Sequence, residues 1–375
     1  MNSTIRICFI VSSLCNEGPV NVMYNIIQYM DFSKFEVSII TLIPEKENTR
    51  INDFRKLPIA IYQITDEHAV GIRKMFNTLK AMVIKIDPHI IHTHCPRSLY
   101  LSYFLPKKYK CAYTIHIYPG LQQEILYGKL KGCIVNMLNH YFTHRVDLPI
   151  ACADSISELY KKNKHREIMS IPNGCSLPVW ENNNEQKKVI RNNLGLKDNI
   201  KYFIFIGRFS FEKNPQILVE AFHQLKDPEI GLIMLGNGPL WEDLRKYENE
   251  NIVFPGFKTN VYDYLIASDY YISASDVEGL ANTLLESMTI GLPLLLSDIP
   301  SHNEILSKMN QTVGFIFDNK NPEDLKIKIN KIIQSVDINS ASSEIKCIFE
   351  KLYTAKKMSQ SYQTAYSRLY LKKSN

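Results

Sequence analysis

Strand, loop and helix signals meet in one stretch of the chain, Ser273-Ala-Ser-Asp-Val-Glu278-Gly-Leu-Ala-Asn-Thr-Leu-Leu-Glu286-Ser-Met288. An apolar run, Tyr270-Tyr-Ile-Ser-Ala, leads into it and is typical of a buried strand that ends in a polar loop. Gly279 lets the backbone turn, and Asn282 is expected to cap a helix with apolar residues at 284, 285 and 288. A strand, a loop and a helix in this order form the repeating unit of an α/β fold.

Two carboxylates in this stretch flank the expected helix start. Glu278 lies in the loop and Glu286 one turn into the helix, with seven residues between them. A helix start offers unpaired N–H groups and a partial positive charge, which suits a phosphate. Carboxylates do not bind phosphate, so their expected partners are hydroxyl groups, as on a ribose or a hexose. The arrangement indicates a sugar-nucleotide pocket; the alternative is a loop carboxylate beside a solvated helix carboxylate, and these residues alone leave both open.

Length and composition indicate a soluble protein. The chain has 375 residues, enough for two domains of ordinary size. No apolar run reaches the roughly 18 residues of a membrane-spanning helix, and segment 6–15 is not followed by a signal-peptide cleavage site. The eight cysteines include no Cys-x-x-Cys pair, which favours reduced core residues over a disulfide or zinc framework. We therefore expect a cytoplasmic protein.

Positive charge is concentrated in the first half of the chain. Residues 1–175 contain 21 Lys and Arg against 14 Asp and Glu, whereas residues 176–375 contain 23 against 24. An expected amphipathic helix at 70–86 carries four of these cations, Arg73, Lys74, Lys80 and Lys85, and three more lie within 107–110. No nucleic-acid-binding motif accompanies them, so the expected partner is an anionic membrane surface or a phosphorylated substrate. A general bias toward surface lysines is the alternative.

Two series of strands and helices follow one another along the chain. Strands are expected in the first half at 5–12, 36–42, 59–64, 90–94, 112–115 and 148–152, with one long helix at about 122–143. A second series has strands at 202–207, 231–235, 252–254, 270–273, 294–297 and 314–317. We expect two Rossmann-like βαβ domains, 1–175 and 176–354, that face each other across a cleft. A C-terminal helix at about 355–375 is expected to pack back onto the first domain.

A second loop of the C-terminal domain carries two cations. Gly207-Arg208-Phe-Ser-Phe-Glu-Lys213-Asn-Pro follows a strand and precedes a helix. Arginine can bind phosphate oxygens with two N–H groups, and lysine adds a point charge. Alone, this sequence also fits a solvated basic loop. Beside Glu278 and Glu286, it predicts a diphosphate site next to hydroxyl acceptors.

These motifs together resemble the retaining family 4 glycosyltransferases (GT4, glycosyl transferases group 1), which have the GT-B architecture. Glu278 and Glu286 match the Glu-x7-Glu signature of that family, and its Gly-Arg…Lys-Asn loop is matched by Gly207, Arg208, Lys213 and Asn214. Three further segments fit in the family order, 171–174, 235–239 and 298–305. The resemblance extends more weakly over 5–120, through His92, His94 and His116.

The resemblance implies a role for each matched residue. Arg208 and Lys213 would bind the donor diphosphate and stabilise its charge as it leaves, and Glu278 would hold hydroxyls of the donor sugar. Glu286 would accept hydrogen bonds from the ribose. The remaining donor-binding positions are Gly207 and the amides of Leu280, Ala281, Asn282 and Thr283.

The N-terminal domain would supply two further donor contacts. Gly18 would approach the diphosphate, and His116 would reach the donor sugar. The family loop usually has paired glycines, whereas Glu17-Gly18-Pro19 has one, so the approach of the backbone there is in doubt. For His92, packing inside the domain is the expected role.

The expected reaction is transfer of a hexose from a nucleotide diphosphate sugar, with a UDP-sugar favoured, and with retention at the anomeric carbon. The acceptor is expected to be a hydroxyl of a lipid-linked glycan in O-antigen, capsule or exopolysaccharide synthesis. No acidic pair between hydrophobic flanks suggests a divalent-ion site, so no metal and no cofactor are expected. The enzyme would then lie on the cytoplasmic face of the inner membrane as a peripheral protein.

Other functional classes also use βαβ repeats. An NAD-dependent oxidoreductase needs a Gly-x-Gly-x-x-Gly turn after its first strand, and this chain has none there. A nucleotide-sugar epimerase on the same two-domain fold would keep the diphosphate site, and it stays as the alternative. A non-catalytic binding protein fits less well, because both halves of a donor site are present.

Overall fold

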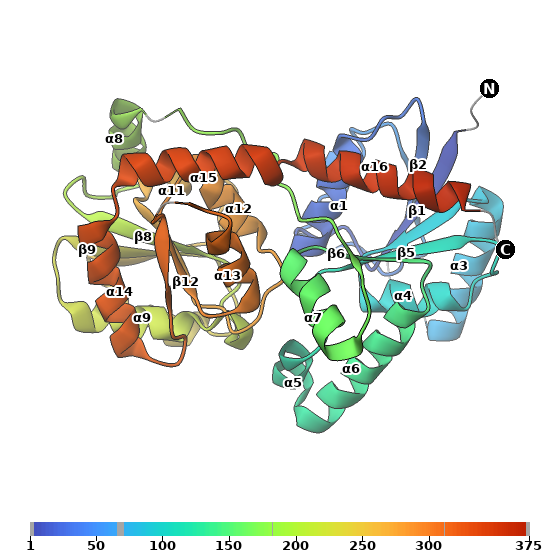
Figure 1. Ribbon diagram of the computed structural model, residues 1–375, viewed down its shortest axis with the longest axis horizontal. Coiled ribbons are helices and arrows are strands. Elements are labelled where there is room, and N and C mark those ends of the chain that lie inside the picture. Colours follow the sequence, from blue (N-terminus) through green and yellow to red (C-terminus); the bar gives the residue numbers. More distant parts are fainter. Residues whose placement is uncertain (1–3, 66–70, 182, 311, 373–375) are drawn as a thin grey trace. The chain divides into compact units, whose positions relative to one another are not determined.

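The computed structural model describes residues 4–65, 71–181, 183–310 and 312–372, and the chain divides into two compact units (Figure 1). The first unit contains residues 1–176 together with 354–375, and the second contains residues 177–353. Each unit is built on one parallel sheet with helices packed against it. The predicted α/β fold with two Rossmann-like domains is therefore confirmed.

The sheet of the first unit has seven parallel strands in the order β3-β2-β1-β4-β5-β6-β7. They are β1 Ile5–Val11, β2 Phe35–Thr41, β3 Ala60–Gln63, β4 Ile90–Thr93, β5 Lys110–Ile115, β6 Leu148–Ala151 and β7 Met169–Ser170. The strand order reverses between β1 and β4. Open parallel sheets bind their ligands at such a reversal, outside the carboxyl ends of the strands.

Strand β1 is buried on both faces of this sheet. Ile7 and Phe9 belong to one apolar cluster, whereas Cys8 and Ile10 belong to another that includes Leu79. Because both faces are covered, the sequence of β1 is a continuous apolar run rather than an alternation of apolar and polar residues.

The first unit has eight helices among the described residues. They are α1 Gly18–Gln28, α2 Ile51–Phe54, α3 Ile72–Ile86, α4 Pro96–Tyr103, α5 Leu121–Tyr127, α6 Lys129–His144, α7 Asp154–Lys164 and α16 Ala355–Leu371. The basic helix predicted at 70–86 is α3, and residue 70 itself lies outside the described residues. Short helices α4 and α7 were not predicted, because few of their residues are apolar at helical spacing.

The prediction of a single helix at about 122–143 is wrong, because the structure has two helices there, α5 and α6. Gly128 separates α5 from α6 with a φ of +78°, a backbone conformation that favours glycine. Gly132 lets the two helices pack closely, since a Cβ atom there would lie 2.7 Å from the carbonyl oxygen of Gln123.

Helix α16, near the C-terminus, packs against α1 and belongs to the core of the first unit. The Tyr362 and Tyr366 side chains are fully buried, and their hydroxyls lie 2.9 Å from Thr114 Oγ1 and 2.6 Å from His92 Nδ1. His92 therefore has a structural role, as its sequence context predicted. The C-terminal helix predicted at about 355–375 is α16, and the side chain of its N-cap, Thr354, accepts a hydrogen bond from the Lys357 amide.

The sheet of the second unit has six parallel strands in the order β10-β9-β8-β11-β12-β13. They are β8 Lys201–Ile206, β9 Ile230–Leu235, β10 Ile252–Gly256, β11 Tyr270–Ser273, β12 Leu294–Ser297 and β13 Gly314–Phe317. Its helical segments are α8 Asn184–Asn193, a 3₁₀ turn η1 Phe211–Lys213, α9 Pro215–Leu225, α10 Trp241–Arg245, α11 Val261–Ala267, α12 Asn282–Ile290, α13 Pro300–Ser307, α14 Pro322–Ser335 and α15 Ile338–Leu352. The order of this sheet reverses between β8 and β11.

Helix α8 lies in a polar segment where the sequence pattern predicted neither a helix nor a strand. It is held by charge rather than by apolar packing. The buried Arg191 donates from Nη2 to Asp269 Oδ2 at 2.6 Å and from Nε to the Ala267 carbonyl at 2.8 Å. Lys187 donates to the other oxygen of Asp269 at 2.8 Å. Buried polar groups of this kind have no periodicity that a hydrophobic pattern could detect.

Across the part of the chain that the structure describes, every helix is too short or too polar to cross a bilayer.

Candidate functional site

The two loops that carry the predicted donor residues leave neighbouring strands. Strands β8 and β11 pair through Phe203 with Tyr270 and Ile204 with Tyr271. The loop after β8 carries Arg208 and Lys213, and the loop after β11 carries Glu278. Because the strand order reverses between these two strands, both loops emerge at the position where parallel sheets bind ligands.

An ion pair joins the two loops. Lys213 Nζ contacts Glu278 Oε1, and Ser275 Oγ donates to the same carboxylate oxygen at 3.1 Å. The backbone adds a second link, because the Asp276 amide donates to the Glu212 carbonyl at 2.9 Å. The Glu278 side chain is only 9% exposed, so this charge depends on its partners. Two residues that the sequence assigned to adjacent parts of one donor are thus in direct contact.

Glu286 is placed differently from Glu278. It lies in the second turn of α12, is partly buried, and makes no side-chain hydrogen bond to any of the described residues. Burial raises the pKa of its carboxyl to about 7. A buried carboxylate with unused acceptor capacity can bind hydroxyl groups of a ligand.

The start of α12 differs by one residue from the sequence prediction. Ala281 is the N-cap and Asn282 is the first helical residue, with no cap hydrogen bond from a side chain. Leu280 is buried just before the helix, and Thr283 Oγ1 lies 3.0 Å from the buried Tyr271 hydroxyl. No acidic residue lies in the first turn. The helix start therefore keeps its partial positive charge available for an anion.

The Gly207-Arg208 segment is shaped by a glycine-containing loop that follows β9. Gly236 has a φ of +144°, and a Cβ atom there would lie 1.9 Å from the Gly207 carbonyl oxygen. A Cβ atom at Gly238 would lie 2.4 Å from the Phe209 carbonyl oxygen. Only glycines permit this backbone approach, which leaves Arg208 exposed while Phe209 is buried. Both glycines lie in segment 235–239, which the sequence indicated only as part of a family motif.

A buried histidine supports the Glu278 loop from below. Ser297 Oγ donates to the Ser275 carbonyl at 2.7 Å, and His302 Nδ1 lies 3.1 Å from Ser297 Oγ. Burial lowers the pKa of His302 to about 4, so the ring is neutral at physiological pH. Its Nε2 atom is buried without a hydrogen-bond partner among the described residues. Sequence reasoning did not assign His302 a role, because a single histidine in an α-helix carries no specific signal.

The predicted residues of the first unit lie at the carboxyl ends of its central strands. Gly18 begins α1, rather than lying in the loop before it, and Glu17 is the N-cap. His116 follows β5, and its Nε2 lies 3.1 Å from Nδ1 of His94, which follows β4. Burial lowers the pKa of His116 to about 3 and that of His94 well below its usual value. Both rings are therefore neutral hydrogen-bonding groups near pH 7.

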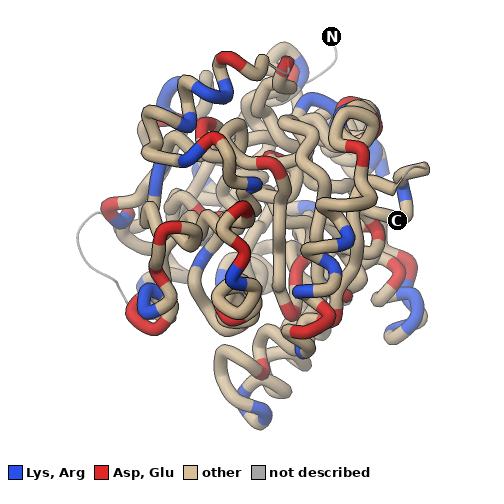
Figure 2. Tube along the Cα trace, turned by 90° about the vertical axis from the view of Figure 1, so that its left-hand side faces the viewer, with Lys and Arg blue, Asp and Glu red and all other residues tan. Residues whose placement is uncertain are grey.

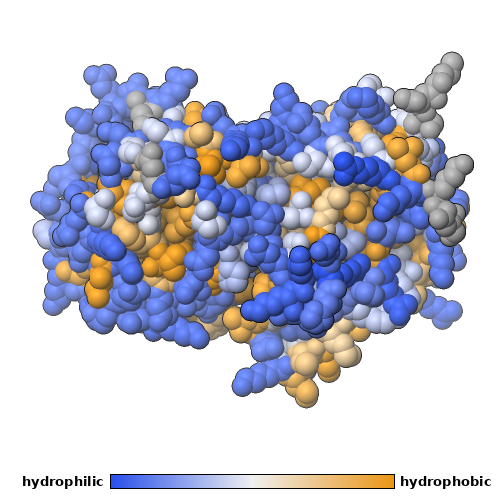
Figure 3. All heavy atoms as spheres, viewed as in Figure 1, coloured by the Kyte–Doolittle hydropathy of each residue, from blue (hydrophilic) through white to orange (hydrophobic). Residues whose placement is uncertain are grey.

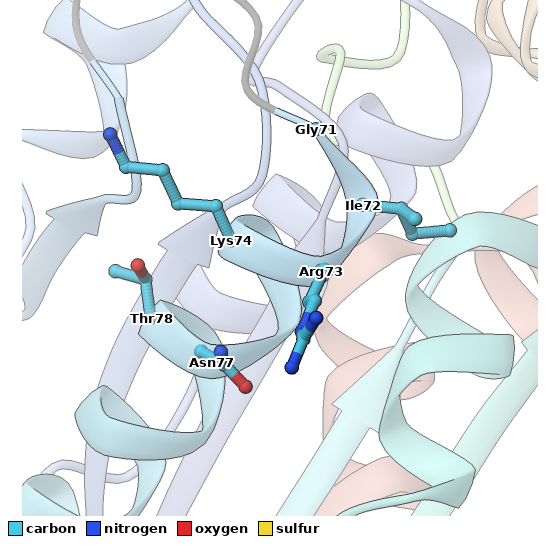
Figure 4. A pocket seen from close by; sticks show the side chains of 6 residues that line it. All are labelled: Gly71, Ile72, Arg73, Lys74, Asn77 and Thr78. Atoms are coloured by element: carbon cyan, nitrogen blue, oxygen red, sulfur yellow. The ribbon is translucent and has the colours of Figure 1, made fainter.

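A hollow at the start of α3 is lined by Gly71, Ile72, Arg73, Lys74, Asn77 and Thr78 (Figure 4). Figure 4 shows the Arg73 and Lys74 side chains leaving the helix in different directions. The polar groups that line this hollow do not point to a common centre, and none of the predicted donor residues lines it. No group of three or more His, Cys, Asp or Glu among the described residues is arranged to hold a metal ion.

Two family models match the chain and together cover most of it. "Glycosyltransferase Family 4" matches residues 17–177, and "Glycosyl transferases group 1" matches residues 186–344. The chain is 29% identical to "Alpha-monoglucosyldiacylglycerol synthase" of Streptococcus pneumoniae, over 58% of this chain and 54% of that enzyme. It thus spans about half the length of that relative.

A second relative is matched more completely. "UDP-Gal:alpha-D-GlcNAc-diphosphoundecaprenol alpha-1,3-galactosyltransferase" of Escherichia coli is 26% identical over 70% of each chain. Among solved structures, Anabaena Alr3699/HepE in complex with UDP and glucose has a TM-score of 0.79 and 16% identity, over 97% of this chain and all of that one. The protein is a glycosyltransferase of the GT-B fold and belongs to the group 1, family 4 glycosyltransferases.

Proposed function

We propose that the protein transfers a hexose from a nucleotide diphosphate sugar to a hydroxyl of a lipid-linked glycan. The observation that carries this proposal is the Lys213–Glu278 pair at the reversal of the second sheet, with Glu286 on the helix that follows. Cationic groups, a helix start and hydroxyl acceptors are the three things that a sugar nucleotide requires. A UDP-sugar is the favoured donor.

Departure of the nucleotide diphosphate creates negative charge that the site must stabilise. Lys213 and the exposed Arg208 supply cations, and the start of α12 supplies amide dipoles at residues 280–283. In the first unit, Gly18 would meet the diphosphate and neutral His116 the sugar. We infer that donor binding draws Lys213 from Glu278 toward the diphosphate, which leaves the Glu278 carboxylate to accept hydrogen bonds from the hexose. This chemistry requires no bound metal.

Retention at the anomeric carbon is proposed to occur with departure and attack on one face of the sugar. Glu278 then positions the hexose and is not a nucleophile. The Glu278→Gln variant separates the two roles, because a nucleophile variant would lose transfer almost entirely, by more than about 10⁴-fold. A positioning residue should leave measurable turnover, with a loss nearer 10–100-fold. The anomeric configuration of the product, measured by NMR, tests retention directly.

The donor can be identified without knowing the acceptor. Thermal shifts of the purified protein with UDP-, GDP- and dTDP-sugars should select one nucleotide, since a bound ligand raises the melting temperature according to its affinity. The same shift should be lost in Lys213→Ala. Conversion of a donor sugar in the absence of any acceptor would instead indicate a nucleotide-sugar epimerase.

Acceptor and location follow from the relatives and from the first unit. The name of one relative refers to a diacylglycerol lipid, and the name of another refers to a diphosphoundecaprenol. Both compounds are membrane lipids. O-antigen synthesis appears in the name of a third relative, from Escherichia coli. We propose the first unit as the acceptor domain of a peripheral enzyme on the cytoplasmic face of an anionic inner membrane, in O-antigen, capsule or exopolysaccharide synthesis. No nucleic acid is expected as a partner.

A further inference from the structure

The inner face of helix α6 is polar, which is unusual for a helix that packs on a domain. Its buried residues are Gly132, Asn139 and Thr143. Asn139 Oδ1 accepts a hydrogen bond from the Tyr100 hydroxyl at 2.5 Å, and Asn136 Nδ2 donates to the Gly120 carbonyl at 3.0 Å. Hydrogen bonds, a close glycine contact and the Phe142 ring, whose centroid lies 4.7 Å from that of Tyr100, therefore hold α6, whereas most surface helices are held by a continuous apolar stripe.

The apolar stripe of α6 faces outward instead. Its members lie on one face of the helix at positions i, i+4, i+7, i+8 and i+11, which are Leu130, Ile134, Met137, Leu138 and Tyr141. All five side chains are exposed, Leu130 to 80% and Met137 to 64%. Figure 3 shows apolar atoms gathered where this part of the first unit projects.

Helix α5 packs against α6 and carries further exposed apolar side chains. Leu121, Leu126 and Tyr127 are exposed, and α5 has no buried residue. We call α5 and α6 together the apolar hairpin. Exposed apolar side chains that gather on neighbouring helices mark a surface that binds something apolar.

Positive charge borders the apolar hairpin. Lys129 and Lys131 are exposed on either side of the stripe, and the Arg145 guanidinium lies 4.3 Å from the Tyr141 ring centroid. Glu124 is the only acidic residue in the sequence from 121 to 145. Figure 2 shows the projecting segment mostly tan, with blue at its tip. Apolar side chains edged by cations and tyrosines suit the boundary between lipid tails and headgroups.

We propose that the apolar hairpin docks the protein on an anionic lipid bilayer. Leu130, Ile134 and Met137 enter the tail region, while the lysines meet anionic headgroups. This inference rests on the proposed function, because a lipid-linked acceptor would lie in the same bilayer that the apolar hairpin binds. A second copy of the chain is a poorer occupant, because a symmetric dimer through this face would bring the two cationic rims together.

The test is partition of the full-length protein onto vesicles, measured by sedimentation without any substrate. Wild type should bind phosphatidylglycerol-containing vesicles more tightly than phosphatidylcholine vesicles. The triple variant Leu130→Ser, Ile134→Ser, Met137→Ser should bind at least about tenfold more weakly, because it removes exposed apolar area. Lys129→Gln with Lys131→Gln should reduce binding to the anionic vesicles alone.

Ile327→Ser is the matched control for this loss. Ile327 lies on α14 of the second unit and is 62% exposed, against 50% for Ile134, and its replacement should leave partition unchanged. A single tryptophan variant tests the same contact by a gain of signal, so the conclusion does not depend on whether the triple variant folds. Leu130→Trp fluorescence should shift to the blue on vesicles and be quenched by brominated lipid, whereas Ile327→Trp fluorescence should not.

Three results would overturn the proposal: unchanged partition of the triple variant, equal loss in Ile327→Ser, or a wild-type dimer that the triple variant abolishes without vesicle binding. Failure of the proposed function looks different. In that case the protein would partition onto vesicles but give no thermal shift with any sugar nucleotide. Conversely, the triple variant should keep the donor-dependent shift of wild type.

Discussion

The two sheets place different chemistry at comparable positions. At the reversal of the second sheet, Lys213 and Glu278 hold opposite charges in contact. Beside the reversal of the first sheet, His94 and His116 lie 3.1 Å apart as a neutral pair. Under the proposed function, the charged pair would suit a diphosphate, whereas the neutral pair would suit hydroxyl groups, which need hydrogen bonds and no charge. The same topology therefore presents different chemistry in each unit through the side chains that follow its strands.

Removal of the cation from the charged pair should have the largest effect. Lys213→Ala should lower turnover by roughly 10²–10³-fold, the usual cost of losing one group that stabilises developing negative charge. It should also destabilise the second unit by about 1–3 kcal/mol, because Glu278 is left buried without its partner. Steady-state kinetics and thermal unfolding measure the two effects.

A double variant separates catalysis from stability. Lys213→Ala combined with Glu278→Gln should recover the unfolding temperature, because the unpaired charge is gone, but should not recover turnover. Recovery of turnover in the double variant would contradict a direct role for Lys213.

The ionisation of Glu286 adds a pH dependence to the site of the second unit. A carboxylate accepts hydroxyl hydrogen bonds better than a neutral carboxyl, so affinity for the sugar nucleotide should rise as the pH passes through about 7, the pKa of Glu286. Glu286→Gln should bind about 10–100-fold more weakly at pH 8 and lose this pH dependence. Calorimetric titration with UDP at several pH values measures both. An unchanged pH profile in the variant would assign the dependence to another group.

The ionisation of Glu286 should also affect the stability of the fold, which should fall as the pH rises, whereas the affinity for the sugar nucleotide should increase. The pKa of Glu286 is raised from 4.5 to about 7 in the folded protein, so the native state binds more protons between these values. Its contribution to stability is therefore greatest at low pH and is lost as the pH rises through 7. Glu286→Gln should accordingly be more stable than wild type at pH 8 and not at pH 4.

The two units should lose stability at different pH values as the solution is acidified. His92, His94 and His116 are kept neutral by burial and regain their ordinary pKa on unfolding, so each opposes folding as the pH falls below about 6.5. Each contributes about 1.4 kcal/mol of lost stability per pH unit once protonated in the unfolded chain. In the second unit, His302 acts in the same direction but Glu286 opposes it. Hydrogen exchange between pH 7 and 5 should show the first unit losing protection earlier; simultaneous loss would contradict the difference.

The smallest expected effect concerns the support beneath Glu278. His302→Ala removes the ring that contacts Ser297, which in turn donates to the Ser275 carbonyl. Because His302 makes no hydrogen bond to a predicted donor-binding residue within the described parts of the chain, we expect a loss of only about 3–10-fold in kcat/KM, the effect of slight misplacement. His302→Gln, which can keep the contact to Ser297, should recover most of it. Equal loss in both variants would contradict a positioning role.

The sequence predicted the elements that obey a simple period. Strands β11, β12 and β13 begin and end where the apolar runs placed them. Helix α8 and the break at Gly128 were missed, because one is stabilised by the buried Arg191 and the other by a single residue with positive φ. Neither feature alters hydrophobic periodicity.

The candidate site was predicted as a set of residues and not as a set of contacts. Motif spacing gave Lys213 and Glu278 separately, and only their strands' adjacency brings them together. The pKa of Glu286 and the support from His302 depend on burial, which a linear pattern does not encode. The outward-facing stripe of α6 has ordinary helical periodicity, so its sequence would indicate a buried face.

Helix α16 gives the chain a fixed order of completion. The core of the first unit includes Met358, Tyr362 and Tyr366, which are synthesised after every residue of the second unit. On the ribosome, the second unit can therefore fold while the first still lacks a helix, although N-terminal domains usually fold first. Until α16 arrives, the polar atoms of His92 and Thr114 lack the tyrosine hydroxyls that lie beside them in the finished protein. A nascent chain stopped before residue 354 would expose that surface to chaperones and proteases.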